Sequence, residues 1–136
     1  MSKLRAFLKE NKVANMTKEV IISERIKDEN GKPIPFVITN IPNKEFTRLQ
    51  DMCTKTNKKG KVDFNSGLFS MEVIKNFTVE PCFKDVKVLE ELGCSTPEAA
   101  IEECLLAGEI AELSSQISKF SGFDQDLDEL KQEAKN

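Results

Sequence analysis

Three carboxylates near the end of the chain have the spacing that comes closest to a chemical site. Asp124, Asp126 and Asp128 repeat the D-x-D-x-D start of a calcium-binding EF-hand loop. The rest of that loop does not fit, because its sixth position should be glycine and is Glu129, and its twelfth should be glutamate and is Lys135. The pattern therefore predicts no calcium site, and the acids suit the first turn of a helix, where they complement its dipole.

The other residues that could perform chemistry are few. The chain has no histidine, which removes the usual proton-transfer side chain at neutral pH and every Ser-His-Asp or Cys-His pair. Its many carboxylates fall on predicted exposed helix faces, with no apolar pocket to change their acidity. The sequence therefore predicts a protein that is not an enzyme and needs no cofactor.

Four cysteines are present, Cys53, Cys82, Cys94 and Cys104, and none belongs to a C-x-x-C pair. We expect buried free thiols, as in most proteins of a reducing compartment. The alternative is a zinc site, which would need all four cysteines from scattered positions.

Composition predicts one cytoplasmic domain. The 136 residues are enough to bury a core, and no stretch approaches the ~20 apolar residues of a membrane helix. The opening MSKLRAFLKENK is charged throughout and lacks the apolar core of a secretory signal.

Charge is divided unevenly along the chain. Residues 1–61 hold 14 Lys/Arg and 7 Asp/Glu, which gives +7, whereas residues 62–136 hold 6 and 16, which gives −10. The two halves could pair internally, associate with another copy, or simply be solvated. The basic half, with the run KTNKKGK at 55–61, leaves a small nucleic-acid-binding regulator as the alternative function. No aromatic residue interrupts these lysines, so we expect a flexible, solvated loop there.

The N-terminal third predicts a short helix and a β-hairpin. Leu4, Phe7 and Leu8 fall on one side of a helix over residues 3–11. A hairpin is expected over about 18–40, with a strand at 18–27 and a turn at Asn30-Gly31, where both residues tolerate positive φ. The return strand contains Pro33 and Pro35, which donate no backbone hydrogen bond, so it should begin at a sheet edge.

The remainder, about 42–135, predicts mainly helices and makes the fold class α+β. Helices are expected over 42–54, 65–79, 84–92, from Pro97 onward, over 109–120 and from Phe123 to Lys135. Gly93 should end one of them, a Thr96 cap followed by Pro97 should start the next, and Gly108 should break it or allow a close contact.

An apolar stripe at helical spacing runs through the C-terminal part and is the predicted partner-binding surface. Its members are Ile110, Leu113, Ile117, Phe120, Phe123, Leu127 and Leu130. For the members from 110 to 120 the plainer alternative is packing on the protein's own core. For the last three, both alternatives stay open, because terminal helices are poorly tied down.

Four segments carry a family resemblance when taken in order. They are ISERIKDENGKPIPFVI, CTK before the lysine-rich run, VEPCFKDVKVLEELGCSTPEAAI and LLAGEIAELSSQISKFSGFDQDLDELKQEAKN. Together they resemble the XkdN-like tail assembly chaperones of contractile-tailed phages, prophages and phage-tail-like bacteriocins of Gram-positive bacteria. Each motif is weak alone, and the order and spacing make the resemblance specific.

The resemblance implies a non-enzymatic function in phage tail assembly. Such proteins are thought to hold the tape-measure protein in solution and to help recruit tail-tube subunits around it. It further implies residence in the cytoplasm of the bacterial host and absence from the mature particle. Protein partners are then expected, with self-association open, no membrane, and no nucleic acid as partner.

Overall fold

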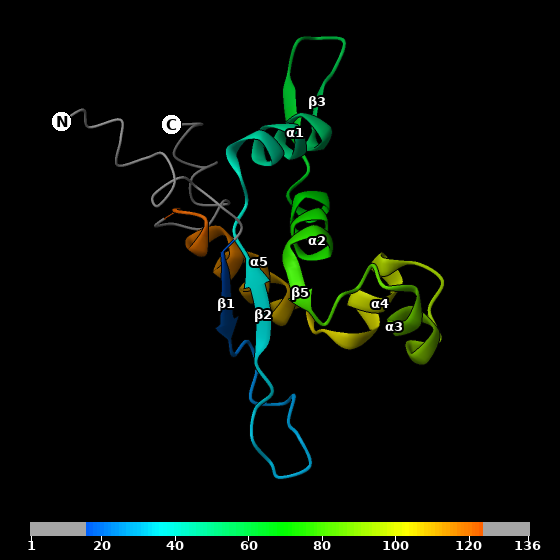
Figure 1. Cartoon of the computed structure of the whole chain (residues 1–136). Helices are drawn as coiled ribbons and strands as arrows, with labels where there is room; N and C mark the ends of the chain where they lie inside the picture. The colour runs from blue at the N-terminus through cyan, green and yellow to red at the C-terminus, as the bar shows by residue number, and fades with distance from the viewer. Residues whose placement is uncertain (1–15, 124–136) are drawn as a thin grey trace, which may run out of the picture.

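A computed structural model describes residues 16–123 (Figure 1). Within them helices and strands are both present, so the α+β class is confirmed. The helix predicted over 3–11 and the segment 124–135 of the last predicted helix lie outside the described residues.

One sheet has three antiparallel strands in the order β1-β2-β5. The strands are β1 (Thr17–Val20), β2 (Phe36–Thr39) and β5 (Thr78–Glu80). The predicted pairing of the first two strands is confirmed, with Thr17 opposite Thr39 and Val20 opposite Phe36. The expectation that the return strand begins at an edge is wrong, because β2 is central. Pro33 and Pro35 both precede it and so remove no hydrogen bond from its ladder.

The strand predicted over 18–27 ends at Val20, and a long hairpin extension over 21–35 follows. A single bridge pairs Lys27 with Pro33 near its tip. At the tip, the Asp28 carboxylate accepts the N–H groups of Asn30 and Lys32 at 2.8 and 3.0 Å. In this turn Gly31 has positive φ, at +79°, and Asn30 does not, so only the glycine uses the conformation that both residues tolerate.

The lysine-rich run forms an ordered hairpin of β3 (Thr54–Thr56) and β4 (Val62–Phe64), which corrects the expected flexible loop. The turn of this hairpin has the same hydrogen-bond pattern as the turn at the tip of the hairpin extension. The Asn57 side chain accepts the N–H groups of Lys59 and Lys61, each at 2.9 Å, and Gly60 has φ +79°. An Asx residue, a glycine three positions on and a final lysine therefore build both turns. In Figure 1 this hairpin projects away from α1.

Five helices follow the predicted boundaries closely. They are α1 (Asn43–Cys53), α2 (Ser66–Phe77), α3 (Val86–Leu92), α4 (Pro97–Cys104) and α5 (Ala107–Phe120). Thr96 caps α4 by accepting the Ala99 N–H at 3.1 Å, and Gly93 ends α3 in the left-handed conformation, both as predicted. The break before α5 falls at Leu105–Leu106, so Gly108 lies in the first turn of a helix and does not interrupt one.

The end of α5 is held by a Schellman turn. Gly122, with φ +105°, donates to the Lys119 carbonyl, and Phe123 donates to the Ser118 carbonyl, both at 3.1 Å. The Ser121 hydroxyl in turn accepts the Ile41 N–H at 2.8 Å. This end of the helix is therefore fixed to the segment that joins β2 to α1.

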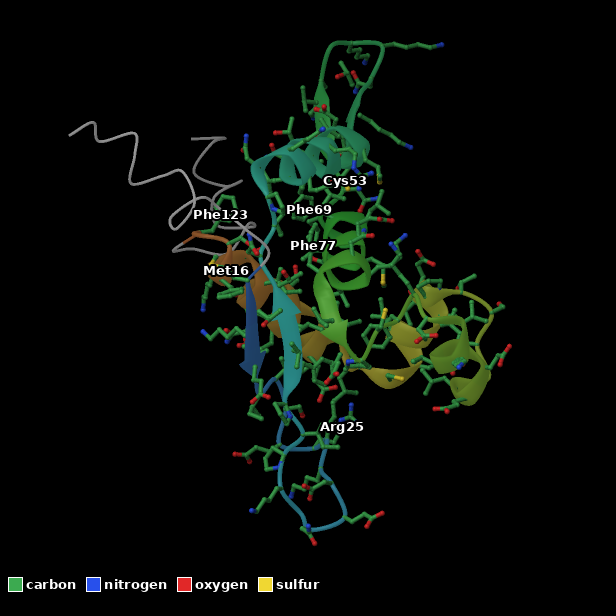
Figure 2. All side chains as sticks on the ribbon, viewed as in Figure 1. Met16, Arg25, Cys53, Phe69, Phe77 and Phe123 are labelled. Carbon is green, nitrogen blue, oxygen red and sulfur yellow. The ribbon has the colours of Figure 1, made fainter. Side chains whose placement is uncertain are left out.

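The core lies between the sheet, α2 and α5. In Figure 1, α5 runs behind β1 and β2, α2 leads directly into β5, and α3 with α4 form a separate lobe at one side. Buried side chains come from the sheet, α1, α2, α4 and α5, and none from α3. Figure 2 labels three of them, Cys53, Phe69 and Phe77. No helix within residues 16–123 has the length and apolar character needed to cross a bilayer.

Candidate functional site

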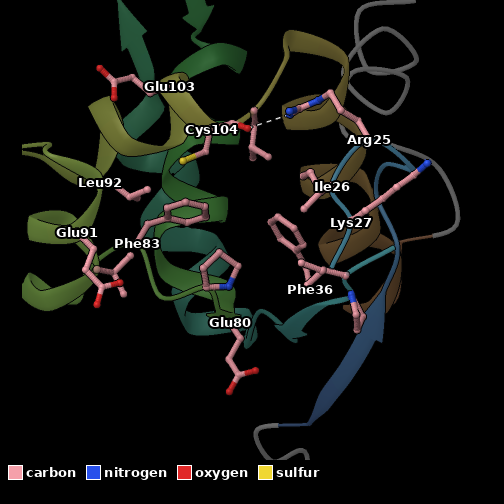
Figure 3. Close-up of a pocket in the computed structure, with 15 residues that line it drawn as sticks. Arg25, Ile26, Lys27, Phe36, Glu80, Phe83, Glu91, Leu92, Glu103 and Cys104 are labelled. Atoms are coloured by element: carbon pink, nitrogen blue, oxygen red, sulfur yellow. Dashed lines mark hydrogen bonds between the residues drawn. The ribbon is translucent and has the colours of Figure 1, made fainter. Parts of the chain in front are cut away.

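A cleft of about 770 Å³ opens between the hairpin extension and the lobe of α3 and α4. Figure 3 shows its two walls: Ile26, Lys27 and Phe36 on one side, and Phe83 and Leu92 on the other. The volume lies within the roughly 300–1,000 Å³ of sites that bury a ligand or several side chains. This cleft is therefore the candidate site.

The cleft is lined by both buried and exposed apolar side chains. Phe36, Phe83 and Leu105 line it and are buried. Ile34 and Leu92 line the two sides and are 41% and 40% exposed. Exposed large apolar side chains that border one hollow are typical of a surface that binds a partner.

Charged groups surround this apolar surface unevenly. Glu80, Glu91 and Glu103 line it, and so do Arg25 and Lys27. The Arg25 charge is neutralised by Glu109, whose carboxylate lies 2.6 Å from it. Three carboxylates are thus opposed by Lys27, and the cleft favours a positively charged occupant.

The Arg25–Glu109 pair connects the hairpin extension to the start of α5. The Arg25 Nε donates to Glu109 at 3.1 Å, and the same guanidinium donates to the Cys104 carbonyl at 3.0 Å. The Glu109 carboxylate also accepts the Leu106 N–H at 2.8 Å, which satisfies a free donor at the helix N-terminus. One buried carboxylate therefore holds a wall of the cleft against α5.

These contacts favour the charged form of Glu109. The Arg25 guanidinium, followed by the Leu106 N–H and the Ser23 side chain, lowers the pKa of Glu109 to about 2 from an ordinary 4.5. A carboxyl whose pKa is lower in the folded state than in the unfolded state stabilises the fold at pH values above its unfolded-state pKa. This contribution is lost as the pH falls toward the folded-state pKa.

Glu109→Gln is therefore expected to lower the melting temperature at about pH 7 and to have progressively less effect between about pH 4.5 and pH 2. Thermal unfolding followed by circular dichroism at several pH values measures this. Glu102→Gln, on an exposed position of α4, is the matched control and should leave the pH dependence unchanged. A difference in melting temperature between wild type and Glu109→Gln that stays constant at every pH would contradict the assigned role of the Arg25–Glu109 pair.

The structure separates the members of the predicted partner-binding stripe. Leu113 and Ile117 are fully buried in the core, and Ile110 and Phe120 are half-buried against it. Phe123 is half-buried, with its ring centroid 4.9 Å from that of Phe46 in α1. Leu127 and Leu130 lie outside the described residues. The partner role of the stripe stays a prediction, and in this conformation Leu113 and Ile117 serve the protein's own core.

Sequence reasoning missed the cleft and its lining residues. Ile34, Phe83 and Leu92 come from three segments that only the folded chain brings together. The one local signal was the pair Val88 and Leu92, which share a side of α3 at a spacing of four. No sequence period connects that helix to the hairpin extension.

The thiols are free but not uniformly buried, which corrects the expectation for three of them. Cys53 is buried, whereas Cys82, Cys94 and Cys104 are partly exposed. The Cys94 thiol donates to the Glu103 carboxylate at 3.2 Å, and this contact raises the pKa of Cys94. Among residues 16–123 no three cysteine or carboxylate side chains are grouped so that they could hold a metal ion.

Comparison with known proteins gives one family. The model of the family described as "Phage XkdN-like tail assembly chaperone protein, TAC" matches residues 4–135. The phage-like element PBSX protein XkdN of Bacillus subtilis strain 168 is 30% identical over 123 residues, which cover 87% of this chain and 83% of that protein. The uncharacterized protein YqbN of the same strain is 31% identical over the same shares of both chains.

The fold is shared with a solved structure. The crystal structure of the protein YqbN superposes with a TM-score of 0.70 at 24% identity, over 91% of this chain and 99% of that one. The match of the family model and the relative at 30% identity both show the family: the chain belongs to the XkdN-like phage tail assembly chaperones.

Proposed function

We propose that this tail assembly chaperone binds the tape-measure protein and helps recruit tail-tube subunits around it. It acts in the cytoplasm of the bacterial host and leaves before the particle is complete. The observation that carries the proposal is the family match over residues 4–135. The proposed role requires binding and release, and it uses no catalytic group and no cofactor.

The physical argument concerns apolar surface. A long helical tape-measure protein exposes an apolar face until tube subunits cover it, and exposed apolar surface promotes aggregation. A chaperone that shields this face needs apolar surface of its own and must release its partner later. The terminal stripe can supply such surface, because an amphipathic segment can bind another helix through its apolar side.

We propose that Phe123, Leu127 and Leu130 contribute most to this contact, with the half-buried Ile110 and Phe120 beside them. The Phe46–Phe123 ring contact supports this, because it fixes the start of the terminal segment next to α1. Leu113 and Ile117 then act indirectly, by holding α5 in the core.

Co-expression with the tape-measure protein of the same gene cluster tests the function. We expect more soluble tape-measure protein and its recovery with this chain on an affinity column. Leu127→Asp should reduce that recovery severalfold while the thermal transition is kept, because the apolar strip would receive a charge. Gln125→Asp adds the same charge nearby and is the matched control.

Two outcomes would contradict these proposals separately. Equal solubility of the tape-measure protein with and without this chain, and no joint recovery, would remove the binding function. Full recovery with Leu127→Asp would keep the function and assign the contact to another surface.

A further inference from the structure

The hairpin of β3 and β4 has an open edge along β4. Within residues 16–123 the sheet that contains β4 has two strands, β3 and β4. Lys61, Val62 and Asp63 are all exposed, Val62 to 64%. Figure 1 shows the outer part of this hairpin standing clear of the rest of the described chain. An exposed strand edge offers its backbone groups to a further strand.

Hydrogen bonds at both ends of the hairpin show which backbone groups this edge presents. The Asn57 N–H donates to the Lys61 carbonyl at 2.9 Å, and the Asn65 N–H donates to the Cys53 carbonyl at 2.8 Å. Hydrogen-bonded and non-hydrogen-bonded pairs alternate along an antiparallel ladder, so Val62 belongs to a non-hydrogen-bonded pair with the β3 residue opposite it. The N–H and C=O groups of Val62 therefore point away from β3, toward a neighbouring strand.

The alternation of side chains limits how β4 can pair with a second copy of itself. Side chains that lie opposite each other must share a face of the joint sheet, so an antiparallel pairing of identical strands is centred on one residue. Val62 is the suitable centre, because its backbone groups point outward and can form two hydrogen bonds with Val62 of the second copy. Lys61 of each copy then lies opposite Asp63 of the other.

This register is complementary in charge and in apolar surface. Within residues 16–123 neither Lys61 nor Asp63 forms an ion pair, so both charges are available. They would meet in the non-hydrogen-bonded pairs on either side of the centre, where opposed side chains lie closest. On the other face of the sheet the two exposed Val62 side chains would cover each other from water.

The other edge of the same hairpin lacks this complementarity. Thr56 lies opposite Val62 and presents its backbone groups outward on β3. A pairing centred on Thr56 would place Lys55 opposite Asn57 of the second copy, with no opposite charges and no apolar pair. The β4 edge is therefore the one suited to self-association. Because both strands of that contact are the same residues, it requires two molecules.

We propose that two copies of this chain associate through β4, antiparallel about Val62, so that their two hairpins form one four-stranded sheet. The contact joins identical surfaces, and it therefore closes at two copies. The hairpin projects away from α1 in Figure 1, so the antiparallel arrangement places the two protein bodies at opposite ends of the joint sheet. The proposal concerns this chain alone and does not depend on the proposed binding of the tape-measure protein.

Sedimentation velocity of the full chain at increasing concentration measures the association. A contact between two short strands is small and therefore weak. We expect the average mass to rise from 15.3 kDa toward twice that value at high concentration and to stop there. A chain that stays monomeric at millimolar concentration, or a mass that grows beyond two copies, would overturn the proposal.

An exchange of charges tests the register. Lys61→Asp places two carboxylates opposite each other on both sides of the centre, and Asp63→Lys places two ammonium groups there. Each variant alone should therefore self-associate more weakly by roughly tenfold or more. An equimolar mixture of the two variants has opposite charges at both positions and should form a mixed dimer about as readily as the wild type. A mixture that stays monomeric would contradict the register.

Two proline variants test the edge. Val62→Pro removes an N–H that points away from β3, so the hairpin keeps its own ladder while the dimer loses its central hydrogen bonds. Thr56→Pro is the matched control, because it removes the outward N–H at the opposite edge. We expect only Val62→Pro to abolish self-association, with circular dichroism melting curves showing that both variants fold. Equal behaviour of the two variants would place the contact on another surface.

Discussion

Leu113→Asp is expected to abolish the cooperative thermal transition. Leu113 lies in the middle of α5 with none of its surface exposed. An unpaired charge in such a site destabilises a protein by several kcal/mol, and even Leu→Ala at a fully buried position costs about 2–5 kcal/mol. Domains of this kind have only about 5–15 kcal/mol in total. Circular dichroism during heating and urea titration measures the loss.

Ala111→Asp is the control for this prediction, since Ala111 is exposed on the same helix. It should change stability by no more than about 0.5 kcal/mol. The comparison also decides between the two interpretations of the apolar stripe. A Leu113→Asp variant that folds as well as Ala111→Asp would mean that this part of the stripe is available to a partner.

Phe69→Ala is expected to lower the free energy of unfolding by about 3–5 kcal/mol. The Phe69 ring is buried and contacts two other rings: Phe46 edge-on at 5.8 Å, and Phe64 at 5.5 Å. Such contacts add about 0.5–1.5 kcal/mol each to the apolar burial. Because Phe46 also contacts Phe123, the loss should loosen the anchor of the terminal segment.

Leu68→Ala gives the matched control, since Leu68 precedes Phe69 in α2 and is partly exposed. Urea unfolding of both variants yields the two free energies, and limited proteolysis reports on the segment after Phe123. Equal stability losses for Leu68→Ala and Phe69→Ala would contradict the central position of the Phe69 ring.

The helices could be predicted because their end signals are local. The side chains of Asn65 and Thr96 accept backbone N–H groups of the helices they precede, and Gly93 and Gly122 have the positive φ that ends a helix. Each signal acts within four residues, so no knowledge of the tertiary structure is needed.

The strands were harder to predict, and for different reasons. β5 consists of Thr78–Glu80 directly after α2, and it is a strand only because β2 pairs with it. The hairpin of β3 and β4 was predictable in principle. Its Asn57…Gly60-Lys61 turn repeats the Asp28…Gly31-Lys32 pattern, but each strand has only three residues and the lysine-rich composition is equally typical of a solvated loop.

The candidate site was beyond local reasoning. Ile34 belongs to a segment that was predicted as plain return strand, Phe83 to a loop, and Leu92 to a helix end. These three residues come together only when the hairpin extension is held against α5. The ion pair that holds it joins Arg25 and Glu109, which are 84 positions apart in the sequence. Amphipathic periodicity describes one element at a time and contains no such information.

The Schellman turn at the end of α5 has a mechanical consequence. A tensile load on the segment after Phe123 first meets the hydrogen bond from Phe123 to Ser118 and the Phe46 ring contact. The bond from Ile41 to Ser121 then transfers part of the load to the junction of β2 and α1. A load applied there is thus shared between the end of α5 and the junction of β2 and α1, two separate parts of the core.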